Sequence, residues 1–234
     1  MRVYLDNAAT TPLDEQVLDV MLPVLKDGFG NPSSTHSYGR KIKSLIERAR
    51  KNIAKHINCK PGEIFFTSGG TEADNMAIRC AVKDLGVKHI VTSTIEHHAV
   101  GHTVNKLKTK GLVDVTYVHL DESGHVDLQH LDQILSRSEK TLVSLMHANN
   151  EIANLLPLHL VSKICQKHGA IFHSDTVQTM AHYRFDMQEL EQVHFLACSA
   201  HKFHGPKGVG FLYVNKSVQI NPLIHGGSQE RNMR

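Results

Sequence analysis

Two polar, glycine-bearing segments of the sequence carry residues suited to binding an anion and a carbonyl group. The first segment, residues 67–72 (TSGGTE), follows an apolar run and precedes a helical pattern. Its glycines let backbone amides approach a ligand closely, and the N-terminus of a helix favours an anion. The segment therefore predicts a phosphate-binding turn that includes Gly70 and Thr71, and a turn without any ligand is the alternative. It matches neither a Walker A loop nor a GxGxxG fingerprint.

The second segment, residues 199–208 (SAHKFHGPKG), places a lysine directly after an apolar run. Lys202, flanked by small and hydroxyl-bearing residues, could form a Schiff base with a carbonyl if its pKa is lowered. A plain basic loop is the alternative. His201 and His204 could supply half of a zinc site, but no thiolate or second histidine pair stands at a suitable spacing. We therefore expect no metal at this segment.

Three further polar clusters follow apolar runs, at residues 96–98, at residues 149–151, and at Asp175 with Gln178. In open α/β sheets, ligands bind beyond the carboxyl ends of the strands. We therefore expect all five clusters to face one crevice. Together they describe a pocket for pyridoxal 5'-phosphate, in which Lys202 holds the aldehyde and Asp175 pairs with the protonated pyridine nitrogen.

The elements that must position these residues alternate along the chain. Short apolar runs are separated by amphipathic helical patterns, which is typical of an α/β fold with a mostly parallel sheet. We expect a seven-stranded sheet flanked by helices in a single domain over residues 1–234. The expected strands are residues 64–67, 89–92, 113–117, 142–146, 170–172, 195–197 and 209–214. The expected helices are residues 42–57, 73–81, 128–135 and 157–165. Alternating polar and apolar residues over 113–117 predict a strand at a sheet edge.

Composition excludes several classes of protein. The chain has 234 residues, and Lys plus Arg exceed Asp plus Glu by 26 to 23, a net charge of +3. This excess is too small to predict a nucleic-acid partner. No apolar run is long enough to cross a membrane, and the first residues have no apolar signal core. The four cysteines form no CxxC pair. We expect a cytoplasmic, reduced protein without a membrane partner.

The motifs, taken together, resemble those of the cysteine desulfurases in the class V aminotransferase family of fold type I pyridoxal-phosphate enzymes. The segments that carry the resemblance occur in order along the chain: residues 4–12 (YLDNAATTP), 30–34 (GNPSS), 67–72, 147–151 (HANNE), 175–178 (DTVQ) and 199–202 (SAHK). The resemblance implies the large domain of a pyridoxal-phosphate transferase.

The resemblance also assigns roles to individual residues. It implies that Lys202 is the Schiff-base lysine and that His97 stacks on the cofactor ring and helps to move protons. Asp175 would bind the pyridine nitrogen, and Asn150 and Gln178 would contact the region of the ring hydroxyl. The residues implied to hold the phosphate are Gly70, Thr71, Ser199 and His201.

The activity implied by the resemblance is the removal of sulfur from L-cysteine, giving L-alanine and a persulfide for iron–sulfur cluster assembly or thiolation. The implied partners are a second copy of the chain, in a homodimer, and a sulfur-acceptor protein such as an iron–sulfur scaffold. Two alternatives stay open: a selenocysteine lyase or another class V lyase, and a non-catalytic, truncated domain that binds cofactor or dimerises.

The chain departs from the family pattern at its C-terminal end. In the family, the catalytic cysteine lies on a loop of a C-terminal small domain, which this sequence does not reach. We therefore expect an N-terminal segment plus the cofactor-binding large domain, truncated before the small domain. We expect this truncated chain to be inactive alone. The cysteines present match no catalytic position and are expected to be packing thiols. They are Cys59, Cys80, Cys165 and Cys198.

Overall fold

A seven-stranded sheet forms the centre of the computed structural model, which describes residues 1–137, 139–227 and 229–234. The strand order is β1-β7-β6-β5-β4-β2-β3. The strands are β1 (Ile64–Thr67), β2 (His89–Thr92), β3 (Asp114–Tyr117), β4 (Thr141–Ser144), β5 (Ile171–Asp175), β6 (Phe195–Ser199) and β7 (Gly210–Val214). Only β7 runs antiparallel to its neighbours β6 and β1. The predicted fold class, a mostly parallel seven-stranded sheet flanked by helices, is confirmed.

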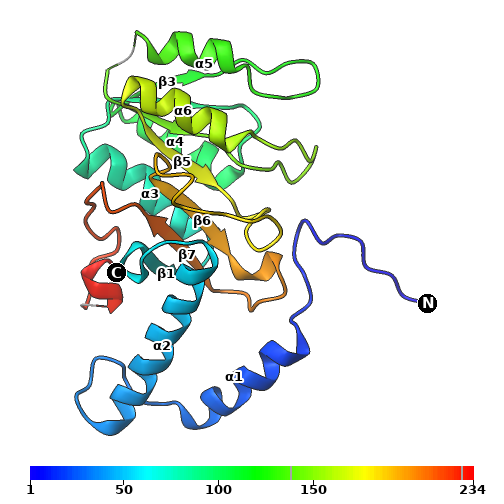
Figure 1. Cartoon of the computed structure of the whole chain (residues 1–234), viewed down its shortest axis with the longest axis vertical. Helices are drawn as coiled ribbons and strands as arrows, with labels where there is room; N and C mark the ends of the chain where they lie inside the picture. The colour runs from blue at the N-terminus through cyan, green and yellow to red at the C-terminus, as the bar shows by residue number, and fades with distance from the viewer. Residues whose placement is uncertain (138, 228) are drawn as a thin grey trace.

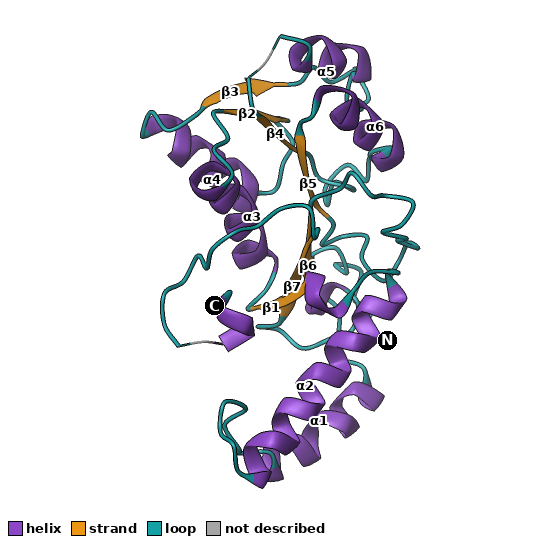
Figure 2. Cartoon of the chain, turned by 60° about the vertical axis from the view of Figure 1, so that its left-hand side comes forward, coloured by secondary structure: helices purple, strands orange, loops and turns teal. Residues whose placement is uncertain are grey.

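Helices cover both faces of this sheet. Figure 2 shows α3 and α4 on one face and α5 and α6 on the other, while α1 and α2 extend beyond the β1 edge, as Figure 1 also shows. The α-helices are α1 (Glu15–Asp27), α2 (Ser37–His56), α3 (Gly70–Asp84), α4 (His98–Thr109), α5 (Leu128–Leu135) and α6 (Leu158–His168). Short 3-10 turns are η1 (Pro61–Glu63), η2 (Ala200–Lys202) and η3 (Gln229–Asn232).

The two faces of the sheet carry two apolar clusters that together form the core. Every residue of β4, β5, β6 and β7 is buried, because these strands are covered by helices or loops on both sides. At the sheet edge, β3 keeps partial exposure at all of its residues. The prediction of an edge strand at residues 113–117 is therefore confirmed.

Two helices, α1 and α4, have no counterpart in the sequence-based prediction. Helix α1 begins after Asp14, whose side chain accepts hydrogen bonds from the amides of Gln16 and Val17, but no residue of α1 is buried. Helix α4 begins after His97, whose imidazole accepts from the Ala99 amide. Histidine is not among the residues that usually signal a helix start, so the beginning of α4 is not evident from the sequence. None of the helices within the described ranges is long and apolar enough to cross a membrane.

Candidate functional site

A cavity of about 720 Å³ opens at the carboxyl ends of the central strands. All of the residues predicted for the site line this cavity: Gly70, Thr71, His97, Asn150, Asp175, Gln178, Ser199, His201 and Lys202. They come from turns that are far apart in the chain. The convergence expected from the sequence is therefore present in the fold.

The N-terminus of α3 forms one wall of the cavity. Gly69 precedes the helix with φ of 148° and ψ of −174°, a conformation available to glycine but not to residues with a side chain. A Cβ atom on Gly70 would lie 2.6 Å from Cγ2 of Val177, so the helix start packs closely on the turn after β5. Free backbone amides and the helix dipole make this wall suited to an anion.

Asp175 ends β5 at the floor of the cavity and is 5% exposed. Its Oδ1 accepts a hydrogen bond of 2.9 Å from the Val177 amide. Burial and the nearby carboxyl of Asp74 raise the pKa of Asp175 to about 7, against the effect of the Val177 amide. A buried carboxylate of this kind gains strongly from a cationic partner such as a protonated ring nitrogen.

Lys202 lies in the 3-10 turn η2, directly after β6. Its Nζ donates hydrogen bonds to the carbonyl oxygens of Ala8 and Ala9. Burial lowers the pKa of Lys202, while the charges of Asp175 and Asp6 oppose this shift. A lowered pKa increases the fraction of neutral amine, which is the form that attacks a carbonyl.

His201 sits beside this lysine, and its Nδ1 lies 3.1 Å from Oγ1 of Thr10. Burial and the charges of Lys202 and Lys207 lower the pKa of His201. His204 Nδ1 lies 3.1 Å from the Pro12 carbonyl oxygen. The described part of the chain brings together no group of three or more His, Cys, Asp or Glu side chains that could hold a metal ion.

The remaining predicted residues enter the cavity from three other turns. His97 stands at the start of α4, and its Nδ1 accepts from Ala99 N at 3.1 Å. Asn150 is placed by its neighbour Asn149, whose Nδ2 donates to the Ile95 carbonyl oxygen at 2.7 Å. Gln178 donates to the carbonyl oxygen of Ala8 at 2.9 Å.

Two contributions to the cavity are absent from the sequence-based prediction of the site. One is the N-terminal segment, which brings Ala8 and Ala9 over Lys202. The other is Asp74, a carboxyl that is 1% exposed and lines the cavity from α3. Asp74 falls at helical spacing among the apolar residues Ala77 and Ile78, and an acidic residue on an apolar helix face is a signal that could have identified it.

Comparison with known proteins identifies the family. The family model for class-V aminotransferases matches residues 3–233. The chain belongs to the class-V aminotransferase family. It is 50% identical to a cysteine desulfurase IscS of Dictyoglomus turgidum, over 99% of this chain and 59% of the relative. It is 45% identical to a cysteine desulfurase IscS of Methanosarcina thermophila, over 99% of this chain and 57% of the relative.

Solved structures of class-V relatives agree with the fold. A NifS-like protein superposes with a TM-score of 0.95 at 42% identity, covering 100% of this chain and 64% of the other. A structure titled as SspA in complex with cysteine superposes with a TM-score of 0.93 at 36% identity, covering 100% of this chain and 67% of the other. The chain thus spans about three-fifths of the length of its curated relatives and has the fold of their large domain.

Proposed function

We propose that this chain forms the cofactor-binding part of a pyridoxal-phosphate-dependent cysteine desulfurase, which takes sulfur from L-cysteine and leaves L-alanine and a persulfide. The observation that carries the proposal is the single cavity in which Lys202, Asp175 and the N-terminus of α3 meet. The names of the relatives support this reaction over other class V lyase reactions. The organisation as one domain over residues 1–234 stays a prediction.

The residues that line the cavity fit the groups of pyridoxal phosphate. The N-terminus of α3, with Gly70 and Thr71, would hold the phosphate together with Ser199 and His201. Asp175 offers the buried carboxylate that a protonated pyridine nitrogen needs, since burial leaves that charge without solvent. When bound, the cofactor supplies an electron-withdrawing ring that stabilises negative charge on the α-carbon of an amino acid.

Two side chains of the chain itself would hold or move protons. Lys202 would carry the cofactor through Nζ and, when released, accept a proton from the α-carbon of the substrate. His97 Nδ1 accepts a hydrogen bond from the Ala99 amide, so the neutral imidazole carries its proton on Nε2. His97 would lie against the ring, with Asn150 and Gln178 near the ring hydroxyl.

The proposal includes partners. Helix α1 has no buried residue and exposes apolar side chains that include Val20 and Leu25, which supports self-association into a homodimer. We propose that the sulfur passes to an acceptor protein such as an iron–sulfur scaffold, in the cytoplasm. Neither partner is a nucleic acid or a membrane in this proposal.

Borohydride reduction tests the proposal at its central residue. We expect the purified chain to bind pyridoxal phosphate and to carry the reduced label on Lys202 after peptide mapping. Lys207 lines the same cavity and gives the matched control. Lys207→Ala should keep the label, whereas Lys202→Ala should lose it. Label on another lysine, or bound cofactor without any label, would refute the assignment.

A further inference from the structure

A row of buried polar side chains lies under the cavity, on the face of the sheet that α3 covers. Thr92 of β2, Ser144 of β4 and His173 of β5 are partners in the strand register, and each is at most 1% exposed. His173 Nδ1 lies 2.9 Å from Ser144 Oγ. Buried polar groups of this kind are costly unless they are paired, so the row requires an explanation.

Asp74 meets this row from α3. Its Oδ1 lies 3.3 Å from His173 Nε2, and both side chains are almost completely buried. Among the described residues, no N–H donation from the imidazole to the carboxylate joins these two atoms. His173 stands two residues before Asp175 on β5, so both side chains project from the same face of the strand. Asp74 and Asp175 also line the same cavity. Two carboxyl groups therefore share one buried site.

Two carboxylates that are buried close together do not both ionise, so the pair holds one proton near neutral pH. Their surroundings decide which carboxyl keeps it. Asp175 accepts an N–H bond from Val177, which stabilises a carboxylate. Asp74 instead lies against an imidazole nitrogen, which accepts a proton when the other nitrogen, Nδ1, donates to Ser144.

Other titratable groups around the pair leave this assignment in place. Burial lowers the pKa of His173 to about 4, so the imidazole is neutral at physiological pH. Burial raises the pKa of Asp74 well above its usual range. The other groups that interact with the pair are His97, Lys202, Glu96 and Cys198. Lys202 is the cation among them, and the attraction between its charge and that of Asp175 favours the ionised form of Asp175.

We propose that Asp74 is a positioning residue for the ring-nitrogen site: it keeps the single proton of the Asp74–Asp175 pair, donates it to His173, and so leaves Asp175 ionised toward the cofactor. This inference rests on the proposed function, because it concerns the site of the pyridine nitrogen. It assigns a role to the three side chains Asp74, His173 and Ser144, which act through Asp175.

The first test needs no cofactor. Nitrogen-15 NMR of the cofactor-free chain should show His173 neutral, with its proton on Nδ1, and the signal is assigned by its loss in His173→Leu. A proton on Nε2 would overturn the proposal, because Asp74 could then only accept. This arm stays informative even if the borohydride experiment shows that Lys202 does not carry the cofactor.

The second test is the dissociation constant for pyridoxal phosphate, measured by fluorescence at neutral pH. Asp74→Asn mimics the protonated carboxyl and should change the constant much less than His173→Leu does. His173→Leu removes the acceptor of the Asp74 proton, so Asp175 is protonated in a larger fraction of the molecules. The affinity for pyridoxal phosphate should then fall by about tenfold, the effect of one pKa unit. The double variant should recover affinity, because Asn has no acidic proton to pass on.

A merely structural role predicts a different pattern, in which the double variant binds at least as weakly as His173→Leu. That result, or an equal loss of affinity in Asp74→Asn, would overturn the proposal. Thr103→Val is the matched control, because it removes a buried hydroxyl of α4 that bonds within its own helix, to the Ala99 carbonyl oxygen at 2.7 Å. Its affinity should equal that of the unmodified chain.

Discussion

Asp175 combines burial, a backbone hydrogen bond and a neighbouring acid at the point where the proposed cofactor needs a negative charge. Its replacement by Asn keeps the shape of the side chain and removes that charge. We expect Asp175→Asn to bind the cofactor at least about tenfold more weakly, because the charge opposite the ring nitrogen is lost, and still to be filled at saturating cofactor through the phosphate site and Lys202. The exchange of the α-proton of L-alanine with deuterated water should fall by about 100-fold, because a charge that stabilises the reacting state is lost. Exchange at the unmodified rate, followed by proton NMR, would contradict the role.

Glu96 is a second acid whose titration the fold controls. Its Oε1 accepts hydrogen bonds from Ser93 Oγ at 2.7 Å and from Met146 N at 3.1 Å, while Oε2 is buried and has no hydrogen-bond partner among the described residues. Burial raises the pKa of Glu96 to about 8, with Ser93 and Met146 opposing and the charges of Asp175 and Asp74 adding to the shift. The folded chain therefore binds a proton that the unfolded chain has released at pH 6.5.

The sign of the resulting pH effect follows from this difference. A raised pKa in the folded state gives stability that is present below the usual pKa and is lost as the pH rises toward 8. The buried His147 and the partly buried His194, with pKa values lowered to about 4 by burial, act in the opposite sense, and their effect is confined to lower pH, between about 4 and 6.5.

We therefore predict that the cofactor-free chain becomes less stable to urea between about pH 6.5 and pH 8, and that Glu96→Gln reduces this loss. One such group can lower the free energy of unfolding by up to about 2 kcal/mol between pH 6.5 and pH 8. Asp132→Asn is the control, since the Asp132 carboxyl has a lowered pKa and stays ionised throughout. An equal pH slope in Glu96→Gln and the unmodified chain would contradict the assignment.

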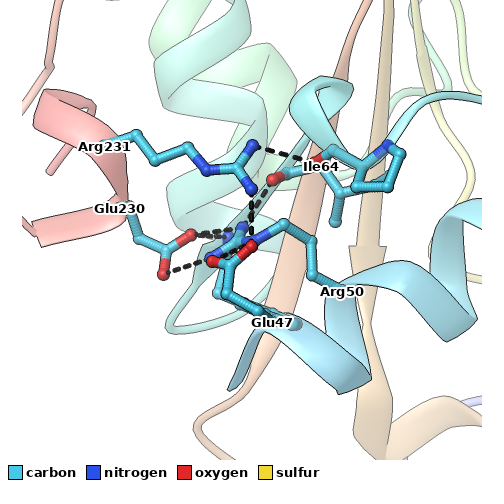
Figure 3. A network of polar contacts seen from close by, with 7 residues as sticks. Glu47, Arg50, Ile64, Glu230 and Arg231 are labelled. Carbon is cyan, nitrogen blue, oxygen red and sulfur yellow. Dashed lines mark hydrogen bonds and ion pairs between the residues drawn. The ribbon is translucent and has the colours of Figure 1, made fainter. Parts of the chain in front are cut away.

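At the scale of single elements, the sheet edge at β1 is closed by side chains. Figure 3 shows Arg50 of α2 and Glu230 of η3 meeting beside β1. Arg50 Nη1 donates to the Ile64 carbonyl oxygen at 2.6 Å, and Glu230 Oε2 accepts from the Phe66 amide at 2.8 Å. Two hydrogen bonds of 2.8 and 3.0 Å join the guanidinium to the carboxylate. The ion pair thus takes the place of a neighbouring strand, which protects an edge that could otherwise pair with another chain.

Breaking this pair should cost stability, because Arg50 is 1% exposed and would keep, among the described residues, only its 3.1 Å ion pair with the partly exposed Glu47. We predict that Glu230→Ala lowers the free energy of unfolding by about 3 kcal/mol, as is usual for one partner of a buried pair. The Phe66 amide should also exchange hydrogen faster. Arg231→Ala removes the more exposed pair with Glu47 and should cost less than about 1 kcal/mol. Equal losses in the two variants would show that burial of the pair is not what matters.

At the scale of the whole molecule, the cysteines lie away from the proposed chemistry. Within the described ranges, no cysteine lines the cavity. Burial raises the pKa of Cys59, Cys80 and Cys165 to about 12, and it raises the pKa of Cys198 well above the usual value of a thiol. Thiols of this kind are poor nucleophiles, because the thiolate is the reactive form.

We predict that none of these four thiols accepts the sulfur. After incubation with pyridoxal phosphate and L-cysteine, alkylation and mass spectrometry should find no persulfide on them, and sulfide release by the chain should be low. Alkylation of the unfolded chain is the control and should label all four thiols. A persulfide on any of them would assign it the catalytic role that the sequence-based prediction denies.

The sequence alone determined the fold class and the convergence of the predicted residues on one cavity, for a physical reason. Apolar periodicity identifies strands and helices, and polar residues that follow buried strands must gather at one edge of a parallel sheet. This is why Lys202, Asp175 and His97 could be assigned to one cavity before any coordinates. Helix α1 escaped the same reasoning because it buries none of its residues.

Only the tertiary structure decided which groups act on those residues. Asp74 and His173 are 99 positions apart in the sequence, and their contact depends on how α3 packs against β5. The carbonyl groups of Ala8 and Ala9 reach Lys202 from the other end of the chain. The meeting of Glu230 with Arg50 likewise depends on where η3 lies beside β1. Contacts between distant segments follow from packing and burial, and periodicity along the chain does not say which distant residue each of these side chains meets.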